Sequence, residues 1–247
     1  MAFDMMAADD KVAISTVYAN MGKAIEAYER QLVSVNFQPS PFDKQLAVLA
    51  GADPNSPELA ETAAMTPGAI RGARLFIGKA ACNECHRGPT FTDFKFHNIG
   101  CPQEGEFVAS IDTGRSSAVT RAMADPFRRD GIYSDAMDAA PFAAIQAAAT
   151  DAKAIGSFKT PSLRNVAKTG PFMHNGVYGD LWTVMDHYNF GGRTGQYSGT
   201  KESTISPLLL SADELNDLVE FLESLSDGPA KTLPAFPEGL VGMPTLP

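Results

Sequence analysis

The stretch Cys82-Asn83-Glu84-Cys85-His86 constrains this chain more than any other part of the sequence. It has the C-x-x-C-H spacing that attaches a c-type haem, because two such thiols can add to the two vinyl groups of the porphyrin. His86 follows directly, so attachment brings its imidazole to the iron as the proximal ligand. A redox dithiol needs no following histidine, and a zinc site needs a second pair of ligands. The motif therefore predicts one covalently bound haem c on Cys82 and Cys85, with His86 on the iron.

Composition and charge limit the kind of protein. The chain has 247 residues and 44% hydrophobic content, enough for a buried core in one large or two small domains. A formal net charge of -9 makes nucleic acid or another polyphosphate a poor partner. No apolar run reaches the length of a membrane span. The third cysteine, Cys101, is expected to be a small buried hydrophobe.

The cofactor and the N-terminus together indicate a compartment. Haem c is attached on the outer side of the bacterial inner membrane, yet the first residues, MAFDMMAADDKVA, lack the basic and then apolar layout of a secretory signal. We therefore expect a periplasmic protein whose sequence here is a mature or truncated chain.

The N-terminal segment has the pattern of a helix. Residues 12–34 place apolar side chains on one face, and Ser15 or Thr16 could cap the start. Pro39 and Pro41 follow and are expected to end the helical region.

Three later helices have clear start signals. Their predicted N-terminal residues are Thr66, Asp180 and Ser211. Pro67 suits the first turn of its helix, and Glu214 completes a capping box in the last one. Gly228-Pro229 is expected to stop that last helix.

The remaining segments indicate an all-α fold with long irregular loops. Residues 101–157 show little periodicity apart from an alanine-rich run at 139–149, and no segment is a convincing strand. We expect a haem domain preceded by a helical lead-in. The predicted divisions are a lead-in at 1–65, a haem domain at 66–228 and a proline-rich extended tail at 229–247.

The sequence pattern alone does not decide which residue is the distal ligand of the iron. The candidates are Met173, Met185, Tyr188, His97, His174, His187 and Lys168. Met185 and Tyr188 share the apolar face of the helix that starts near Asp180, whereas His187 points about a quarter-turn away. A downstream methionine is a common distal ligand in cytochromes c, but most methionines are core residues.

Several segments together resemble the bacterial di-haem cytochrome c peroxidases and their relative MauG. They read FIGKAACNECHRGPTFTDFKFHNIG at 76–100, FKTPSLRNVAKTGPFMHNG at 158–176 and VMDHYNFGG at 184–192. The similarity runs from about residue 10 to residue 227 and matches the C-terminal half of that family. By the resemblance this half is one cytochrome c-like haem domain with its helical lead-in. It carries the electron-transfer haem, and peroxide reacts at a second haem in the N-terminal half.

The resemblance also implies roles for single residues. The distal ligand in the family lies fourteen residues after the histidine of M-H-N-G, which here gives Tyr188 counting from His174. The peroxidases typically have methionine there, and the MauG group has tyrosine. Thr169 and Pro171 correspond to residues whose carbonyls help hold a calcium ion, with a third ligand from the other half.

Four more side chains are candidates near the haem. His174 and His97 are expected near the two haem propionates as structural histidines. Arg164 is either a propionate partner or an ordinary surface ion pair. Trp182 is a candidate electron relay, with packing as the alternative. We assign no catalytic residue to this chain.

Three functions fit these features. The first is the electron-transfer half of a peroxidase or MauG-type oxidoreductase, which needs a second haem domain or a redox protein as partner. The second is a stand-alone mono-haem cytochrome c that carries electrons, and the third is a haem-based sensor. Tyrosine ligation favours the first, because an anionic oxygen donor stabilises ferric iron and lowers the reduction potential. Self-association is a further expectation.

Overall fold

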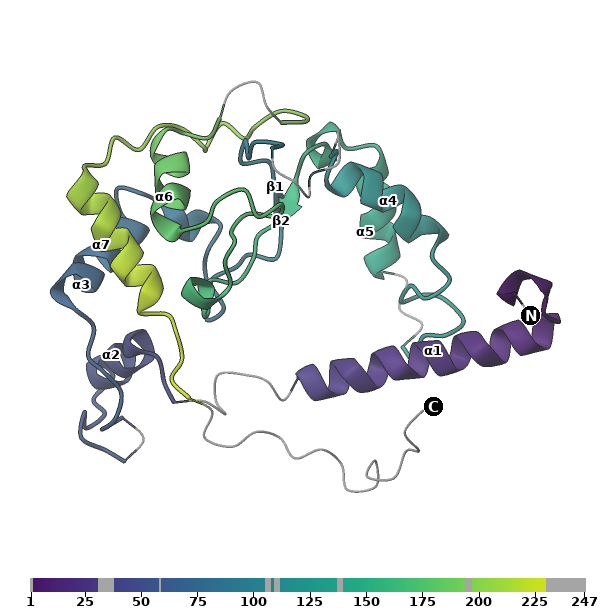
Figure 1. Cartoon of the computed structure of the whole chain (residues 1–247), viewed down its shortest axis with the longest axis horizontal. Coiled ribbons are helices and arrows are strands. Elements are labelled where there is room, and N and C mark those ends of the chain that lie inside the picture. The colour runs from purple at the N-terminus through teal and green to yellow at the C-terminus, as the bar shows by residue number, and fades with distance from the viewer. Residues whose placement is uncertain are drawn as a thin grey trace. The chain divides into compact units, whose positions relative to one another are not determined.

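Figure 1 shows the computed structural model, which describes residues 2–30, 38–57, 59–104, 108, 112–136, 140–193 and 197–229. Within those residues the chain is mostly helical, which agrees with the all-α prediction in outline. The helices are α1 (Ala8–Glu29), α2 (Pro41–Leu49), α3 (Pro67–Ile77), α4 (Arg115–Ala124), α5 (Ala140–Ala149), α6 (Leu181–Asn189) and α7 (Ala212–Glu223). Short 3-10 turns lie at Phe3–Met5, Cys82–Glu84, Ala152–Ala154 and Val166–Lys168.

Two short strands were not expected from the sequence. β1 (Phe96–His97) and β2 (Phe158–Lys159) pair antiparallel, with His97 opposite Phe158. They join the segment after the C-x-x-C-H motif to the segment that begins FKTP. Two residues per strand are too few for any alternating pattern to show in a sequence.

The chain forms two compact units. One contains the described residues up to 63 together with 227–229, and the other contains the described residues between 64 and 226. The first unit includes α1 and α2, and the second includes α3 to α7.

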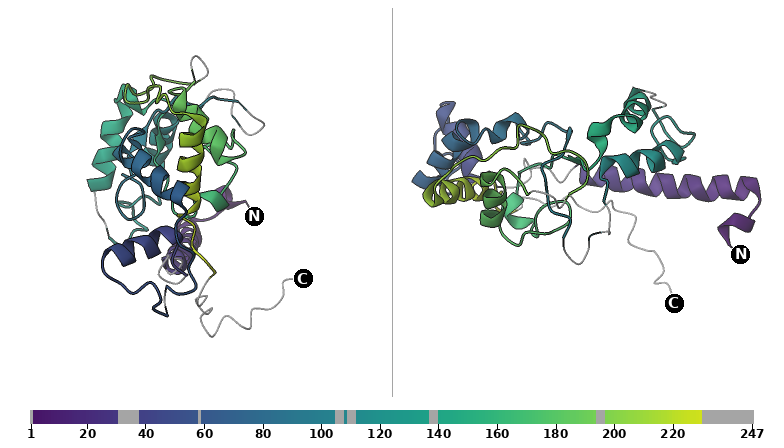
Figure 2. Two further views of the ribbon diagram at one scale, coloured as in Figure 1. Left: turned by 90° about the vertical axis from the view of Figure 1, so that its left-hand side faces the viewer. Right: turned by 90° about the horizontal axis from the view of Figure 1, so that it is seen from above.

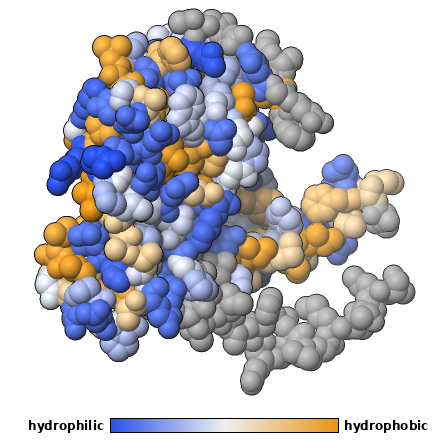
Figure 3. Space-filling view, turned by 60° about the vertical axis from the view of Figure 1, so that its left-hand side comes forward, coloured by the Kyte–Doolittle hydropathy of each residue, from blue (hydrophilic) through white to orange (hydrophobic). Residues whose placement is uncertain are grey.

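Helix α1 begins earlier than predicted. It starts at Ala8 with no side-chain cap, so the assignment of Ser15 or Thr16 as cap is wrong. The acidic Asp9 and Asp10 in the first turn favour this start, because they face the positive end of the helix dipole. Thr16 instead donates its hydroxyl to the carbonyl of Val12 at 2.8 Å, inside the helix. Figure 3 shows apolar side chains in orange along α1, and none of its residues is buried.

Helix α2 was not predicted, because Pro41 was expected only to end the preceding helix. Ser40 caps the helix by accepting a hydrogen bond from the Asp43 amide at 3.2 Å. Pro41 fits the first turn, where no amide hydrogen is needed. The predicted helical residues 31–34 lie outside the described residues.

The core of the second unit lies between α3 and α7, which run side by side (Figures 1 and 2). The ring of Phe76 on α3 lies 5.0 Å from that of Phe221 on α7, centroid to centroid. Phe91, from the loop after the motif, completes this aromatic cluster at 6.0 Å from Phe76. The cluster therefore ties the end of the motif loop to the core.

The predicted start signals of α3, α6 and α7 are confirmed. Thr66, Asp180 and Ser211 each accept a hydrogen bond from an amide of the first turn. Ser211 and Glu214 form the capping box. The predicted end of the last helix at Gly228-Pro229 is wrong, because α7 already ends at Glu223.

The stretch 101–157 has more structure than its sequence suggested. It contains α4 and α5, which contact one another, and α5 coincides with the alanine-rich run. Helix α4 lacks an obvious pattern because Val119 is its only buried residue. Of the predicted tail only Pro229 is described, and 230–247 lie outside the described residues. Among the described helices none is long and apolar enough to cross a membrane.

Candidate haem-binding site

The C-x-x-C-H motif follows α3 through a tight turn. The amides of Ala80 and Ala81 bond back to the carbonyls of Leu75 and Gly78 at 2.9 Å each. The two motif thiols, Cys82 and Cys85, are not joined to one another, and both are half-buried. Burial raises the pKa of the Cys82 thiol to about 12, so it is protonated at neutral pH.

His86 has the environment of a metal ligand. Its Nδ1 lies 2.9 Å from the carbonyl oxygen of Phe91. A carbonyl only accepts, so the neutral ring carries its proton on Nδ1 and has its lone pair on Nε2. Burial lowers the pKa of His86 and holds it neutral. Metal-binding histidines usually donate their other ring nitrogen to such a carbonyl, which fixes the ring orientation.

Helix α6 supplies the candidates for the opposite side of the iron. Met185 is buried and Tyr188 is half-buried. The pKa of the Tyr188 phenol is raised by burial and by the nearby thiols of Cys82, Cys101 and Cys85. The phenol therefore shares one electrostatic environment with both motif thiols, although they are about a hundred residues apart in sequence.

His187 is the residue whose role the sequence did not show. We expected it to point away from the apolar face of α6, but it is 2% exposed. Both of its ring nitrogens are engaged, one by Tyr178 and one by the carbonyl of Ile99. No sequence signal indicates this burial, because both partners come from outside the helix.

His97 is held between two carboxylates. Its Nε2 lies 2.9 Å from Asp93 and its Nδ1 lies 2.8 Å from Glu202. Burial disfavours the charged ring, but the hydrogen bonds that His97 donates to Asp93 and Glu202 outweigh this and raise the pKa of His97. Among the described residues, Cys85, Asp93 and His97 also bring their potential ligand atoms within 4.8 Å of one another. The structure thus brings His97 close to the motif, while its role toward a propionate stays a prediction.

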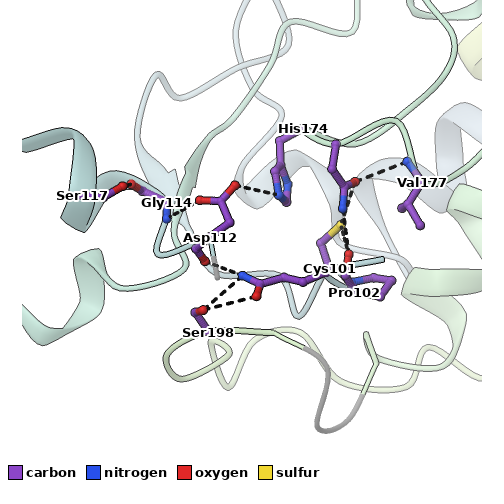
Figure 4. A network of polar contacts seen from close by, with 10 residues as sticks. Cys101, Pro102, Asp112, Gly114, Ser117, His174, Val177 and Ser198 are labelled. Carbon is purple, nitrogen blue, oxygen red and sulfur yellow. Dashed lines mark hydrogen bonds and ion pairs between the residues drawn. The ribbon is translucent and has the colours of Figure 1, made fainter. Parts of the chain in front are cut away.

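His174 lies in the polar network drawn in Figure 4. Its ring stacks on Phe158 with centroids 3.5 Å apart, and its Nε2 lies 3.8 Å from Asp112. Cys101 is buried there, with its sulfur 3.8 Å from the carbonyl of Pro102. The network links the M-H-N-G turn to the loop of residues 101–114. It shows His174 in a structural setting, and its contact with a propionate stays a prediction.

The structure also describes the surroundings of the remaining candidates. Arg164 donates to the carbonyl of Pro89 at 2.9 Å and lies over the ring of Phe91. Trp182 is 42% exposed on α6. The hydroxyl of Thr169 donates to the carbonyl of Val166, and Pro171 is exposed. Met173 adopts a left-handed backbone conformation with φ 68°.

The motif residues and α6 fit a c-type haem by their chemistry. Cys82 and Cys85 offer two free thiols for thioether bonds, and His86 offers a neutral nitrogen whose ring orientation is fixed. Oxygen or sulfur from α6 would complete the coordination. A donor set of this kind is that of a c-type cytochrome.

Comparison with known proteins identifies the family. No family model matches the chain. It is 33% identical to the cytochrome-c peroxidase IdrP1 of Pseudomonas sp. (strain SCT) over 83% of this chain and 48% of that protein. It is 34% identical to the methylamine utilization protein MauG of Methylorubrum extorquens over 87% of this chain and 46% of that protein.

A solved structure shares the fold. The di-haem peroxidase BthA from Burkholderia thailandensis is 20% identical, with a TM-score of 0.51 over 85% of this chain and 51% of that chain. The chain therefore belongs to the family of the bacterial di-haem cytochrome c peroxidases and MauG. It spans about half the length of the curated relatives that it matches.

Proposed function

We propose that this chain is the electron-transfer haem domain of a peroxidase or MauG-type oxidoreductase. The observation that carries the proposal is the setting of His86. This residue follows two free thiols, and its Nδ1–H donates a hydrogen bond to the carbonyl oxygen of Phe91. In the proposal Cys82 and Cys85 bind one haem c covalently and His86 ligates its iron through Nε2. When bound, such a haem supplies one-electron redox chemistry.

Tyr188 is the proposed distal ligand. Burial and the thiols of Cys82, Cys101 and Cys85 raise the pKa of its phenol, and the family spacing from His174 leads to the same residue. Binding to iron requires loss of the phenol proton, because burial holds the phenol neutral. An anionic oxygen donor then favours ferric iron and a low reduction potential. Met185 and Met173 are the alternatives.

The wider assignments rest on family membership. We infer a periplasmic protein whose partner is a second haem domain or a redox protein. Residues 66–228 are the proposed cytochrome c-like haem domain, and the compact unit of residues 64–226 supports that division. A calcium ion at the carbonyls of Thr169 and Pro171 is proposed on the resemblance alone. A stand-alone mono-haem carrier is the alternative function.

Haem attachment is tested by mass. The purified chain should carry the added mass of one haem and should stain for haem after denaturing electrophoresis. Cys82→Ser together with Cys85→Ser should remove the covalent haem, whereas Cys101→Ser should retain it. A wild-type chain expressed with haem-maturation machinery but lacking the added mass would contradict the proposal.

Ligation by Tyr188 is tested by spectroscopy. Tyr188→Phe removes the oxygen while keeping the ring, so the ferric charge-transfer band of a phenolate should disappear and cyanide should bind faster. Met185→Leu is the matched variant on the same helix face and should leave both properties unchanged. The reverse result, with Met185→Leu altering both and Tyr188→Phe altering neither, would assign His/Met ligation.

A further inference from the structure

The imidazole of His187 joins three separate segments of the second unit. Its Nε2 lies 3.1 Å from the carbonyl oxygen of Ile99, in the loop after β1. Its Nδ1 lies 3.0 Å from the hydroxyl of Tyr178, in the turn before α6. His187 and Tyr178 are 2% and 6% exposed. The contact is thus a buried polar connection between α6 and two loops.

The donors and acceptors in this connection are determined by its partners. The Ile99 carbonyl can only accept, so Nε2 carries the ring proton. Nδ1 then accepts from the hydroxyl of Tyr178, and the ring remains neutral. Neither nitrogen is left for iron, which removes His187 from the candidates for the distal ligand. Because both nitrogens are bonded, the ring can neither flip nor rotate without breaking a buried hydrogen bond.

Fixing His187 also fixes which residue of α6 faces the haem motif. Successive residues on an α-helix are about 100° apart around the axis, so Tyr188 points a quarter-turn from His187. The two rings lie edge to face with centroids 5.3 Å apart. Met185, three residues earlier, lies only about 60° from Tyr188 around the same axis. A rotation of α6 by about 60° around its axis would therefore bring the thioether of Met185 to the position of the Tyr188 phenol.

The backbone reinforces this orientation just after the helix. The amide of Gly192 bonds to the carbonyl of His187 at 2.9 Å, and the amide of Arg193 bonds to the carbonyl of Gly100 at 3.1 Å. The loop of residues 98–100 is itself held by the buried Asn98, whose side chain bonds to the carbonyl of Ser198 at 2.8 Å. The loop that carries the Ile99 carbonyl is therefore held in place by further hydrogen bonds.

We propose that His187, held by Tyr178 and the Ile99 carbonyl, is a positioning residue that selects Tyr188 over Met185 as the distal iron ligand. It acts through the rotation of α6 and does not touch the iron. The inference rests on the proposed function, because it presumes a haem ligated from α6.

The test uses the haem-loaded chain and four variants. His187→Leu removes both hydrogen bonds at similar volume, and His187→Gln retains a donor for the Ile99 carbonyl. Val119→Ala is the matched control, since it perturbs a buried residue of α4, which packs against α5 and carries none of the candidate haem residues. Tyr188→Phe reports on the ligation itself. The measurements are the ferric charge-transfer band, the reduction potential and the rate of cyanide binding.

His187→Leu should weaken the phenolate band, raise the reduction potential and speed cyanide binding by about tenfold or more, as expected for loss of an outer-shell partner. His187→Gln should restore much of the wild-type behaviour. Val119→Ala should lower stability and leave all three measurements at wild-type values. The inference is overturned if His187→Leu behaves like Val119→Ala.

The two proposals fail in different ways. If Tyr188→Phe removes the band and His187→Leu does not, Tyr188 is the ligand and only the positioning role is wrong. If Tyr188→Phe leaves the band intact, Tyr188 is not the ligand, and the positioning role is wrong with it.

Discussion

At the scale of single residues, His86 and His97 show how the surroundings determine what a histidine can do. His86 bonds a carbonyl, and burial lowers its pKa, so it stays neutral and suits a metal. His97 bonds two carboxylates that raise its pKa, so it suits a charged structural contact. His86 is part of the motif and His97 lies close to it, and their hydrogen-bond partners distinguish them.

The group of Asp93, His97 and Glu202 makes stability depend on pH. Burial disfavours the charged carboxylate of Asp93, but the hydrogen bonds that it accepts outweigh this and lower its pKa from 3.8 to about 2. Its contribution is therefore present above pH 3.8 and is lost as the pH falls through about 2. The raised pKa of His97 gives a contribution that is full below pH 6.5 and is lost as the pH rises through the folded-state value.

We therefore expect the free energy of unfolding to include a contribution from this group that is greatest between about pH 4 and 6.5. Urea unfolding across pH measures it. His97→Gln, which cannot titrate, should flatten the decline above pH 6.5, and Glu202→Gln should reduce it. An unchanged pH profile in His97→Gln would show that other groups cause the decline.

At the scale of elements, α3 and α7 pack with their backbones close together. Gly72 on α3 makes this approach possible, because a Cβ at that position would clash with the carbonyl oxygen of Asp217 on α7. Arg71 reinforces the pair with two hydrogen bonds to the Asp217 carboxylate, at 2.6 and 2.8 Å. Helix α3 leads directly into the motif, so the packing of this pair also positions Cys82.

Gly72→Ala should therefore destabilise the protein by about 2 kcal/mol or more, since the overlap is with backbone and cannot be relieved by a rotamer change. Denaturant unfolding monitored by circular dichroism gives the value. Gly22→Ala on α1 is the control, because nothing lies within 4 Å of its added Cβ. That variant should be neutral or slightly stabilising through helix propensity. Equal stability of the two variants would show that the helices separate at little cost.

At the scale of the whole molecule, the chain covers about half the length of its curated relatives. It contains one C-x-x-C-H motif, and the proposed function makes it the half that transfers electrons. An electron-transfer domain and a stand-alone carrier therefore differ in one requirement, which is a second haem within electron-transfer reach.

We expect the isolated haem-loaded chain to reduce hydrogen peroxide poorly with a small electron donor. Addition of a partner that carries a second haem should raise the turnover, measured by oxidation of the donor. Free haem at equal concentration is the control for non-specific peroxide chemistry. Saturable, rapid turnover by the isolated chain would place the reactive site within this chain.

The sequence by itself determined the features that depend on neighbouring residues. The C-x-x-C-H motif and the N-caps at Thr66, Asp180 and Ser211 are readable locally, because their rules span only a few residues. The family resemblance rests on several such short motifs in the right order along the chain. The missed helices also have physical reasons. At α2 the proline signal was interpreted as an end, and at α4 a single buried residue gave no periodicity.

Only the tertiary structure decided the contacts made between distant segments. The carbonyl of Phe91 determines the tautomer of His86, and the partners of His187 come from a loop and a turn outside its helix. Spacing alone places Met185 and Tyr188 on the same face, because a helix repeats every 3.6 residues whatever lies opposite. In the proposal, the residue that ligates the iron depends on how α6 is rotated about its axis. The hydrogen bonds of His187 that bear on this rotation are made to residues outside the helix, and no local pattern records them.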